Sequence, residues 1–271
     1  MKSITVNGVS MRFAVKEGEL LALDGLQLRV ESSQFVALIG LSGCGKSTLL
    51  KLVAGLLRPS AGDIRIAEEP VRGPRTDVGM MFQTPVLLPW KSVLDNVMVQ
   101  AVVRRLPRDE YDARARALLR QVGLAGYENR YVFQLSGGMQ QRVAFCRAVL
   151  HHPTVLLMDE PFGALDALTR EQMAFELQSM WATTPAQTVL FVTHSIPEAV
   201  LLADRVAVFS PRPGRIVDVV DVPLPRPRTP EVMSEQEFSH LTARLRSMVF
   251  ASDGADRAAK AGVVATLSDH F

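Results

Sequence analysis

A glycine-rich segment that directly follows an apolar run constrains the fold more than any other part of this sequence. The run Phe35–Ile39 has the continuous apolar character of a strand buried on both faces. Residues 40–48 follow it with the sequence Gly-Leu-Ser-Gly-Cys-Gly-Lys-Ser-Thr, and a helix is predicted from about Lys46 to Leu57. A strand, a glycine-rich turn and a helix in this order are typical of a phosphate-binding loop in an α/β protein.

Each residue type in this loop has a chemical reason to be there. Glycines let backbone N–H groups turn inward and approach an anion. Lys46 is suited to reach the β- and γ-phosphates of a nucleotide, and the Ser47 hydroxyl is suited to coordinate Mg²⁺. A glycine-rich turn with a solvated lysine is the alternative. The predicted nucleotide-binding residues here are Gly40, Leu41, Ser42, Gly43, Cys44, Gly45, Lys46, Ser47 and Thr48.

A second apolar run, Val155–Met158, ends in two acidic residues, Asp159 and Glu160. An apolar strand in a parallel sheet delivers such side chains to the carboxyl edge of the sheet, where ligands bind. Asp159 is suited to hold Mg²⁺, and Glu160 is suited to polarise an attacking water. The alternative is a strand that simply ends in a charged turn.

The order of predicted elements favours an α/β fold with a parallel core sheet. With the glycine-rich loop, this core resembles the RecA-like core of P-loop NTPases. Short β-like runs at 3–6 and 9–13 flank Asn7-Gly8, which predicts a hairpin turn within an N-terminal antiparallel β-subdomain. Residues about 87–152 predict an inserted α-helical subdomain, with a capping box at Ser92–Asp95.

The core is predicted to resume with a helix over 166–182 and strands at Thr188–Val192 and 205–209. Pro211–Pro230 is Pro-rich and is expected to be extended. A helix is predicted over 236–250, and the Ala-rich tail after Ala251 has no strong pattern, so we expect it to be mobile. The nucleotide-binding domain is thus predicted to span 1–230, and 231–271 to form a C-terminal helix and tail.

Composition excludes several classes of function. The formal net charge is only +2, which gives no electrostatic basis for binding nucleic acid. The two cysteines are too few for a disulfide framework and fit a reducing compartment. No stretch approaches the roughly 18 to 20 apolar residues that cross a bilayer. Any work across a membrane is therefore expected to require a partner.

Residues 135–142 have the sequence Leu-Ser-Gly-Gly-Met-Gln-Gln-Arg, which resembles the signature sequence of ATP-binding-cassette (ABC) proteins. Ser136, Gly137 and Gly138 open a helix whose N–H groups are suited to bind a γ-phosphate, and Gln140 belongs to the same motif. The resemblance covers about residues 3–230. It implies an ATPase that uses ATP and Mg²⁺, and a head-to-tail pair in which each signature faces the P-loop of a second subunit.

Other family positions occur in the expected order. Gln83 resembles the glutamine that contacts Mg²⁺ and senses the partner, and His194 resembles the switch histidine that contacts the γ-phosphate. Phe13 resembles the aromatic that stacks on adenine, for which a core phenylalanine is the alternative. Residues 164–166, Ala-Leu-Asp, resemble the loop that crosses the dimer interface. The resemblance implies catalytic roles for Glu160, His194, Lys46 and Gln83, and metal ligation by Ser47, Gln83 and Asp159.

The sequence Leu-Leu-Pro-Trp at Leu87–Trp90 resembles the ATPases of the nitrate, sulfonate, taurine and bicarbonate importer group, close relatives of which carry thiamine precursors. Pro211–Ile216 and Val222–Arg228 fit the same group. This implies a peripheral subunit on the cytoplasmic face of the plasma membrane. It would bind a permease through a groove near Gln83 and Leu87–Trp90, and act indirectly with a solute-binding protein.

Three other functions compete with this interpretation. The first is the ATPase subunit of an exporter or lipid transporter. The second is a soluble ABC ATPase acting on DNA or ribosomes, but such proteins usually carry coiled-coil insertions, zinc motifs or two fused cassettes, none of which is in this sequence. The third is a non-catalytic regulatory module, against which the presence of Glu160 and His194 argues.

Overall fold

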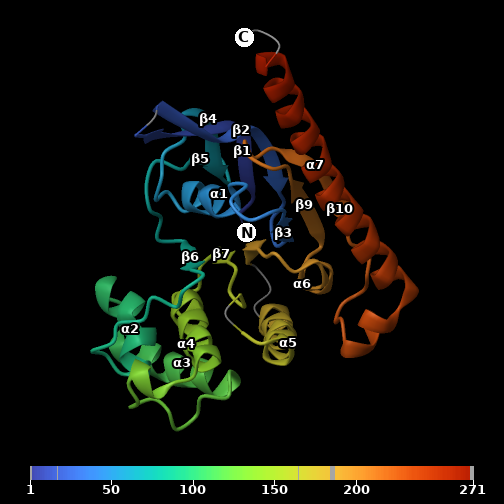
Figure 1. Cartoon of the computed structure of the whole chain (residues 1–271). Coiled ribbons are helices and arrows are strands. Elements are labelled where there is room, and N and C mark those ends of the chain that lie inside the picture. The colour runs from blue at the N-terminus through green and yellow to red at the C-terminus, as the bar shows by residue number, and fades with distance from the viewer. Residues whose placement is uncertain (1, 17, 164, 184–186, 269–271) are drawn as a thin grey trace.

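The structure is a computed structural model that describes residues 2–16, 18–163, 165–183 and 187–268, and it arranges the strands in two sheets (Figure 1). The larger sheet has the order β10-β9-β3-β8-β7-β6. Neighbouring strands are parallel except for β10, which is antiparallel to β9. Its strands are β3 (Phe35–Ile39), β6 (Val78–Met81), β7 (Val155–Asp159), β8 (Thr188–Val192), β9 (Arg205–Phe209) and β10 (Ile216–Asp221). The predicted α/β class with a parallel core sheet is confirmed.

The smaller sheet is antiparallel, and its first strand differs from the sequence prediction. Its strands, in the order β2-β1-β4-β5, are β1 (Ile4–Val15), β2 (Gly18–Val30), β4 (Ala61–Ile66) and β5 (Glu69–Pro70). The hairpin turn expected at Asn7-Gly8 is wrong, because β1 continues through it and pairs with both β2 and β4. Gly8 has a φ of 58° at a shift of register between Val6 and Val9, so it forms a bulge rather than a turn. The hairpin connection lies instead between Val15 and Gly18.

Helices cover the core sheet and form a separate cluster at one end (Figure 1). In that cluster α2 packs against both α3 and α4, as a helical insertion would. Ser92 caps α2 by accepting a hydrogen bond from the Asp95 N–H at 3.1 Å, as the capping box predicts. The helices are α1 (Lys46–Val53), α2 (Val93–Val103), α3 (Arg108–Gln121), α4 (Gly137–Val149), α5 (Ala167–Thr183), α6 (Ile196–Leu202) and α7 (Gln236–Ser268), with short 3-10 turns at Val132–Gln134 and Pro230–Ser234.

In the C-terminal part, one element adds to the prediction and another is longer than predicted. The Pro-rich stretch Pro211–Pro230 contains a strand, β10, which pairs with β9 at the edge of the core sheet. The helix predicted over 236–250 is longer, because α7 continues to Ser268 and projects past the sheets in Figure 1. Alanine-rich sequence favours this continuation; the mobility of the tail stays a prediction. Among the described residues, no helix combines the length and apolar character needed to cross a membrane.

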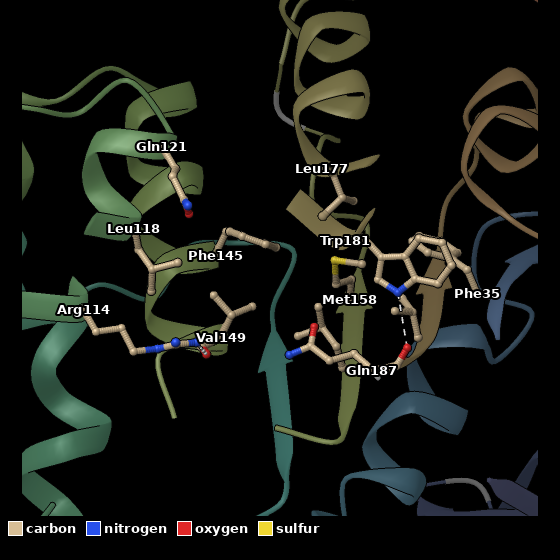
Figure 2. Close-up of a pocket in the computed structure, with 12 residues that line it drawn as sticks. Phe35, Arg114, Leu118, Gln121, Phe145, Val149, Met158, Leu177, Trp181 and Gln187 are labelled. Atoms are coloured by element: carbon tan, nitrogen blue, oxygen red, sulfur yellow. Dashed lines mark hydrogen bonds between the residues drawn. The ribbon is translucent and has the colours of Figure 1, made fainter. Parts of the chain in front are cut away.

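An apolar cavity marks the joint between the helical cluster and the core sheet (Figure 2). Leu118 of α3 and Phe145 of α4 face it from one side, and Met158 of β7 and Trp181 of α5 face it from the other. The Trp181 indole N–H donates to the backbone oxygen of Gln187 at 3.2 Å, which satisfies the polar end of this side chain. Apolar packing across this joint fixes where α4 begins relative to the core.

Arg228 is the largest buried cation in the described part of the chain, and its removal is expected to destabilise the fold. Only 2% exposed, it donates to backbone oxygens at the end of α6 and after β10; the acceptors are Val200, Leu201, Ala203, Val222 and Leu224. Burial lowers the pKa of Arg228 to about 10.

Because these carbonyls would lose their donor, Arg228→Met is expected to lower the free energy of unfolding by about 3 kcal/mol. Urea denaturation followed by circular dichroism measures this loss. Arg29→Met, at an exposed arginine paired with Glu31, is the control and should change stability by less than about 0.5 kcal/mol. Equal, small losses for both variants would contradict a structural role for Arg228.

Candidate active site

The phosphate-binding loop lies where the sequence predicts it, between the end of β3 and the start of α1. Gly45 precedes α1 with a φ of 106°, a left-handed conformation that favours glycine. A Cβ added there would overlap the side chain of Leu23 on β2. The close approach of loop and strand therefore requires glycine, and it places the antiparallel sheet beside the loop.

Lys46 points into this loop rather than into solvent. It is only 4% exposed, and its Nζ donates to the backbone oxygens of Gly40 and Leu41 at 2.8 and 2.9 Å. A buried ammonium whose partners are neutral carbonyls would gain strongly from an anion in the same place. This position of the Lys46 side chain agrees with the predicted contact to phosphates, which stays a prediction.

Ser47 and Asp159 come together from positions more than a hundred residues apart in the sequence. The Ser47 hydroxyl donates to Asp159 Oδ1 at 2.7 Å. Burial raises the pKa of Asp159, and the hydrogen bond from Ser47 offsets part of that effect. A hydroxyl and a carboxylate provide the oxygen ligands that Mg²⁺ prefers, so the donor set at this point fits the predicted metal.

Glu160 lies at the centre of a second group of polar side chains. Gln83 Nε2 donates to Glu160 Oε2 at 3.0 Å, and His194 Nδ1 lies 3.6 Å from the same oxygen. The Glu160 backbone has a φ of 44°, an uncommon conformation for a residue with a side chain, and its N–H donates to the Val192 oxygen of β8. Such local strain is often found at functional sites. Glutamine, histidine and glutamate can together position and polarise one water molecule.

One cavity joins most of these groups. Phe13, half-buried on β1 of the antiparallel sheet, forms part of its wall, whereas Glu160 follows β7 of the core sheet. Arg212 also lines the cavity. In the sequence it lies within Pro211–Ile216, which fits the importer group, and no motif indicates that it lies at this site. The lining residues are Phe13, Leu20, Ala22, Ser42, Gly43, Gly45, Lys46, Ser47, Thr48, Gln83, Glu160 and Arg212.

The signature residues Ser136, Gly137, Gly138 and Gln140 do not line this cavity. Ser136 caps α4 by accepting a hydrogen bond from the Met139 N–H at 3.4 Å. Gln140 Nε2 donates to the backbone oxygens of Val132 and Leu135, at 3.2 and 3.3 Å. Within one chain, therefore, the signature and the phosphate-binding loop are separate.

The remaining predicted residues do not line this cavity. Gly40, Leu41 and His194 line a neighbouring hollow to which α7 also contributes side chains, and Cys44 is buried. Asp166 caps the start of α5 by accepting from the Thr169 N–H at 3.0 Å. Ala164 lies outside the described residues.

The parallel sheet, the glycine-rich loop at its carboxyl edge and the paired carboxylates define a P-loop nucleoside triphosphatase. Comparison with known proteins specifies the family. Residues 23–163 match the family described as ABC transporter. The chain belongs to the ABC transporter family, and it is an ATPase subunit of that family.

Several relatives match most of the chain. An uncharacterised ABC transporter ATP-binding protein of Methanocaldococcus jannaschii is 44% identical over 225 residues, covering 83% of this chain and 84% of the relative. The taurine import ATP-binding protein TauB of Burkholderia thailandensis is 46% identical over 217 residues, covering 80% and 83%. TauB of Rhizobium johnstonii is 43% identical over 257 residues, covering 92% and 97%.

A solved structure agrees with the fold and the nucleotide assignment. The dimeric ATP-binding cassette MJ0796, in a post-hydrolysis state bound to ADP and Pi, superimposes with a TM-score of 0.72 at 28% sequence identity. The match covers 81% of this chain and 98% of that cassette.

Proposed function

We propose that this chain is the ATP-hydrolysing subunit of a binding-protein-dependent importer for a small solute of the taurine and sulfonate class, with nitrate and bicarbonate as the next candidates. The observation that carries this proposal is the match to taurine import ATP-binding proteins at 43–46% identity, which extends over at least 80% of the chain. These relatives favour an importer over an exporter and over a soluble ATPase acting on DNA or ribosomes.

In this proposal Glu160 polarises the attacking water, and Gln83 and His194 hold Glu160 in place through Oε2. Lys46 and the backbone N–H groups of the loop bind the β- and γ-phosphates. Phe13 stacks on adenine from β1. Ser47, Asp159 and Gln83 are the proposed Mg²⁺ ligands, and this ion would neutralise phosphate charge. The distances of 2.7 Å between Ser47 and Asp159 and 3.0 Å between Gln83 and Glu160 support these roles.

A second copy of the chain would complete the site. Ser136, Gly137 and Gly138 do not line the cavity of their own chain, and the N–H groups at the start of α4 are suited to bind the γ-phosphate held by another chain. The dimeric state of the related cassette supports this arrangement. ATP would then join the two copies, and loss of the γ-phosphate would release them.

The permease site proposed near Gln83 and Leu87–Trp90 includes a groove between the core and the helical cluster; Phe82 and Val86, their sequence neighbours, line it. Met80, Phe82, Val86 and Val99 contribute its apolar lining. Arg147, which also lines the groove, donates a hydrogen bond to the Val86 backbone oxygen at 2.8 Å. Val86 is 57% exposed and Trp90, on the same loop, is 71% exposed. An apolar groove with exposed anchors fits a short helix of a membrane partner. This contact would hold the subunit at the cytoplasmic face of the plasma membrane.

Solute uptake in cells that lack this protein tests the proposal. Uptake of taurine, alkanesulfonates, nitrate, bicarbonate and thiamine precursors is measured in the deletion strain, and again after return of the wild-type gene or of a Lys46→Ala variant. We expect uptake of one solute, a sulfonate, to be lost and to return with the wild-type gene alone. Unchanged uptake of all these solutes, with ATPase activity intact in vitro, would keep the ATPase assignment and contradict the assignment to this importer group.

A further inference from the structure

Arg212 lies in the loop 210–215 between β9 and β10, and its guanidinium reaches the phosphate-binding loop. Nε and Nη2 both donate to the backbone oxygen of Gly43, at 3.1 and 2.8 Å. Arg212 is exposed and lines the same cavity as Lys46 and Ser47. The guanidinium therefore brings a positive charge and two donors in a fixed fork to one carbonyl of the phosphate-binding loop.

Loop 210–215 is fixed in place by contacts with two other parts of the chain. The Gly214 N–H donates to the Ala22 oxygen at 2.9 Å, and the Asp24 N–H donates to the Gly214 oxygen at 3.1 Å. A Cβ on Gly214 would overlap the backbone oxygen of Cys44, so this segment packs directly against the phosphate-binding loop. Arg212 is thus presented from a backbone that has little freedom to move.

The Gly43–Cys44 peptide, whose oxygen accepts from Arg212, also supplies an N–H group that faces the interior of the phosphate-binding loop. In a planar trans peptide the C=O and N–H groups point in opposite directions. When the Gly43 oxygen faces Arg212, the Cys44 N–H therefore faces the loop interior, where it lies 3.4 Å from the Leu41 oxygen. Lys46 Nζ donates to the same oxygen at 2.9 Å. Two donors thus converge on a point where a phosphate oxygen would be a stronger acceptor than a carbonyl.

We propose that Arg212 is a positioning residue that holds the Gly43–Cys44 peptide with its N–H facing the bound phosphates, and so sets the affinity of the site for nucleoside di- and triphosphates. The proposal rests on the assignment of this cavity to ATP. Arg212 acts through the loop and does not contact the γ-phosphate.

Nucleotide binding to the full chain tests this role by isothermal titration with ADP and with a non-hydrolysable ATP analogue. Arg212→Ala is expected to weaken both affinities by about 5- to 10-fold, because a charge-assisted hydrogen bond to the loop is lost at an exposed site. The loss should be equal for the two nucleotides. In steady-state hydrolysis, KM should rise by the same factor while kcat at saturating ATP stays within about twofold.

Two comparisons separate this role from general support of the fold. Arg215→Ala is the matched control, because Arg215 lies on the same loop but pairs with Asp24, away from Gly43; it should keep wild-type affinity. Added methylguanidinium should restore part of the affinity of Arg212→Ala, whereas methylammonium should not.

Wild-type affinity in Arg212→Ala, or an equal loss in Arg215→Ala, would overturn the proposal. A larger loss for the triphosphate than for ADP would also overturn it, by indicating a direct γ-phosphate contact. Failure of the wild-type chain to bind either nucleotide would instead reject the assignment of the cavity to ATP.

Discussion

Glu160→Gln is expected to lower the rate of ATP hydrolysis by about 10²- to 10⁴-fold, the range for loss of a positioned general base. The amide keeps the size of the side chain and an acceptor oxygen, so contacts of the kind made by Gln83 Nε2 and His194 Nδ1 are retained. It lacks the negative charge that polarises water. ATP binding is therefore expected to survive while hydrolysis fails, which should trap an ATP-loaded pair of subunits.

Phosphate release measures the rate, and sedimentation velocity with and without ATP measures the association. Glu171→Gln, at an exposed glutamate on α5, is the control and should hydrolyse ATP at the wild-type rate without accumulating dimer. A normal rate in Glu160→Gln would mean that another group polarises the water.

Lys46→Ala is expected to weaken ATP binding by on the order of 10²-fold and to abolish measurable hydrolysis, because a buried cation at the phosphates is removed. Lys46 is only 4% exposed and its Nζ lies between the Gly40 and Leu41 oxygens. These oxygens lose a donor in the variant, so its melting temperature must be measured beside its affinity.

Lys51→Ala provides the matched control for this variant. Lys51 lies on the same helix, α1, but its side chain is exposed. It should bind ATP as the wild type does. If Lys46→Ala remained folded and bound ATP with unchanged affinity, the phosphate-binding role of the loop would be refuted.

The sequence predicts the arrangement around Ser47 and Asp159 well because local pattern and sheet geometry act together. Phe35–Ile39 and Val155–Met158 are apolar runs that each end in functional residues, and parallel strands bring their carboxyl ends to one edge. The observed 2.7 Å hydrogen bond between Ser47 and Asp159 is the kind of contact that this geometry implies. Glu160 and His194, which follow β7 and β8, meet for the same reason.

Features that depend on contacts between distant segments could not be predicted in this way. Asn7-Gly8 has the local chemistry of a hairpin turn, but pairing of β1 on both of its edges converts it into a bulge. Arg212 follows β9, which lies next to β3 in the sheet, and it reaches Gly43 only through this lateral pairing. Strand β10 is not predicted from the sequence because proline residues flank it. Proline is tolerated there because β10 lies at the edge of the sheet.

We propose above that two copies of this chain share each ATPase site, and mixing two inactive variants tests this arrangement. Lys46→Ala removes the phosphate-binding lysine and leaves the signature intact. Gly137→Asp puts a negative charge at the signature, where open space surrounds the glycine and the chain has room for a side chain.

ATP hydrolysis is measured for each variant alone and for an equal mixture. Each variant alone should be inactive, whereas a mixed dimer contains one site with an intact phosphate-binding loop from the Gly137→Asp chain and an intact signature from the Lys46→Ala chain. The mixture should therefore recover roughly a quarter of the wild-type rate, since about half the dimers are mixed and each has one complete site. No recovery on mixing, with dimers present, or full activity of Gly137→Asp alone, would contradict a site shared between two copies.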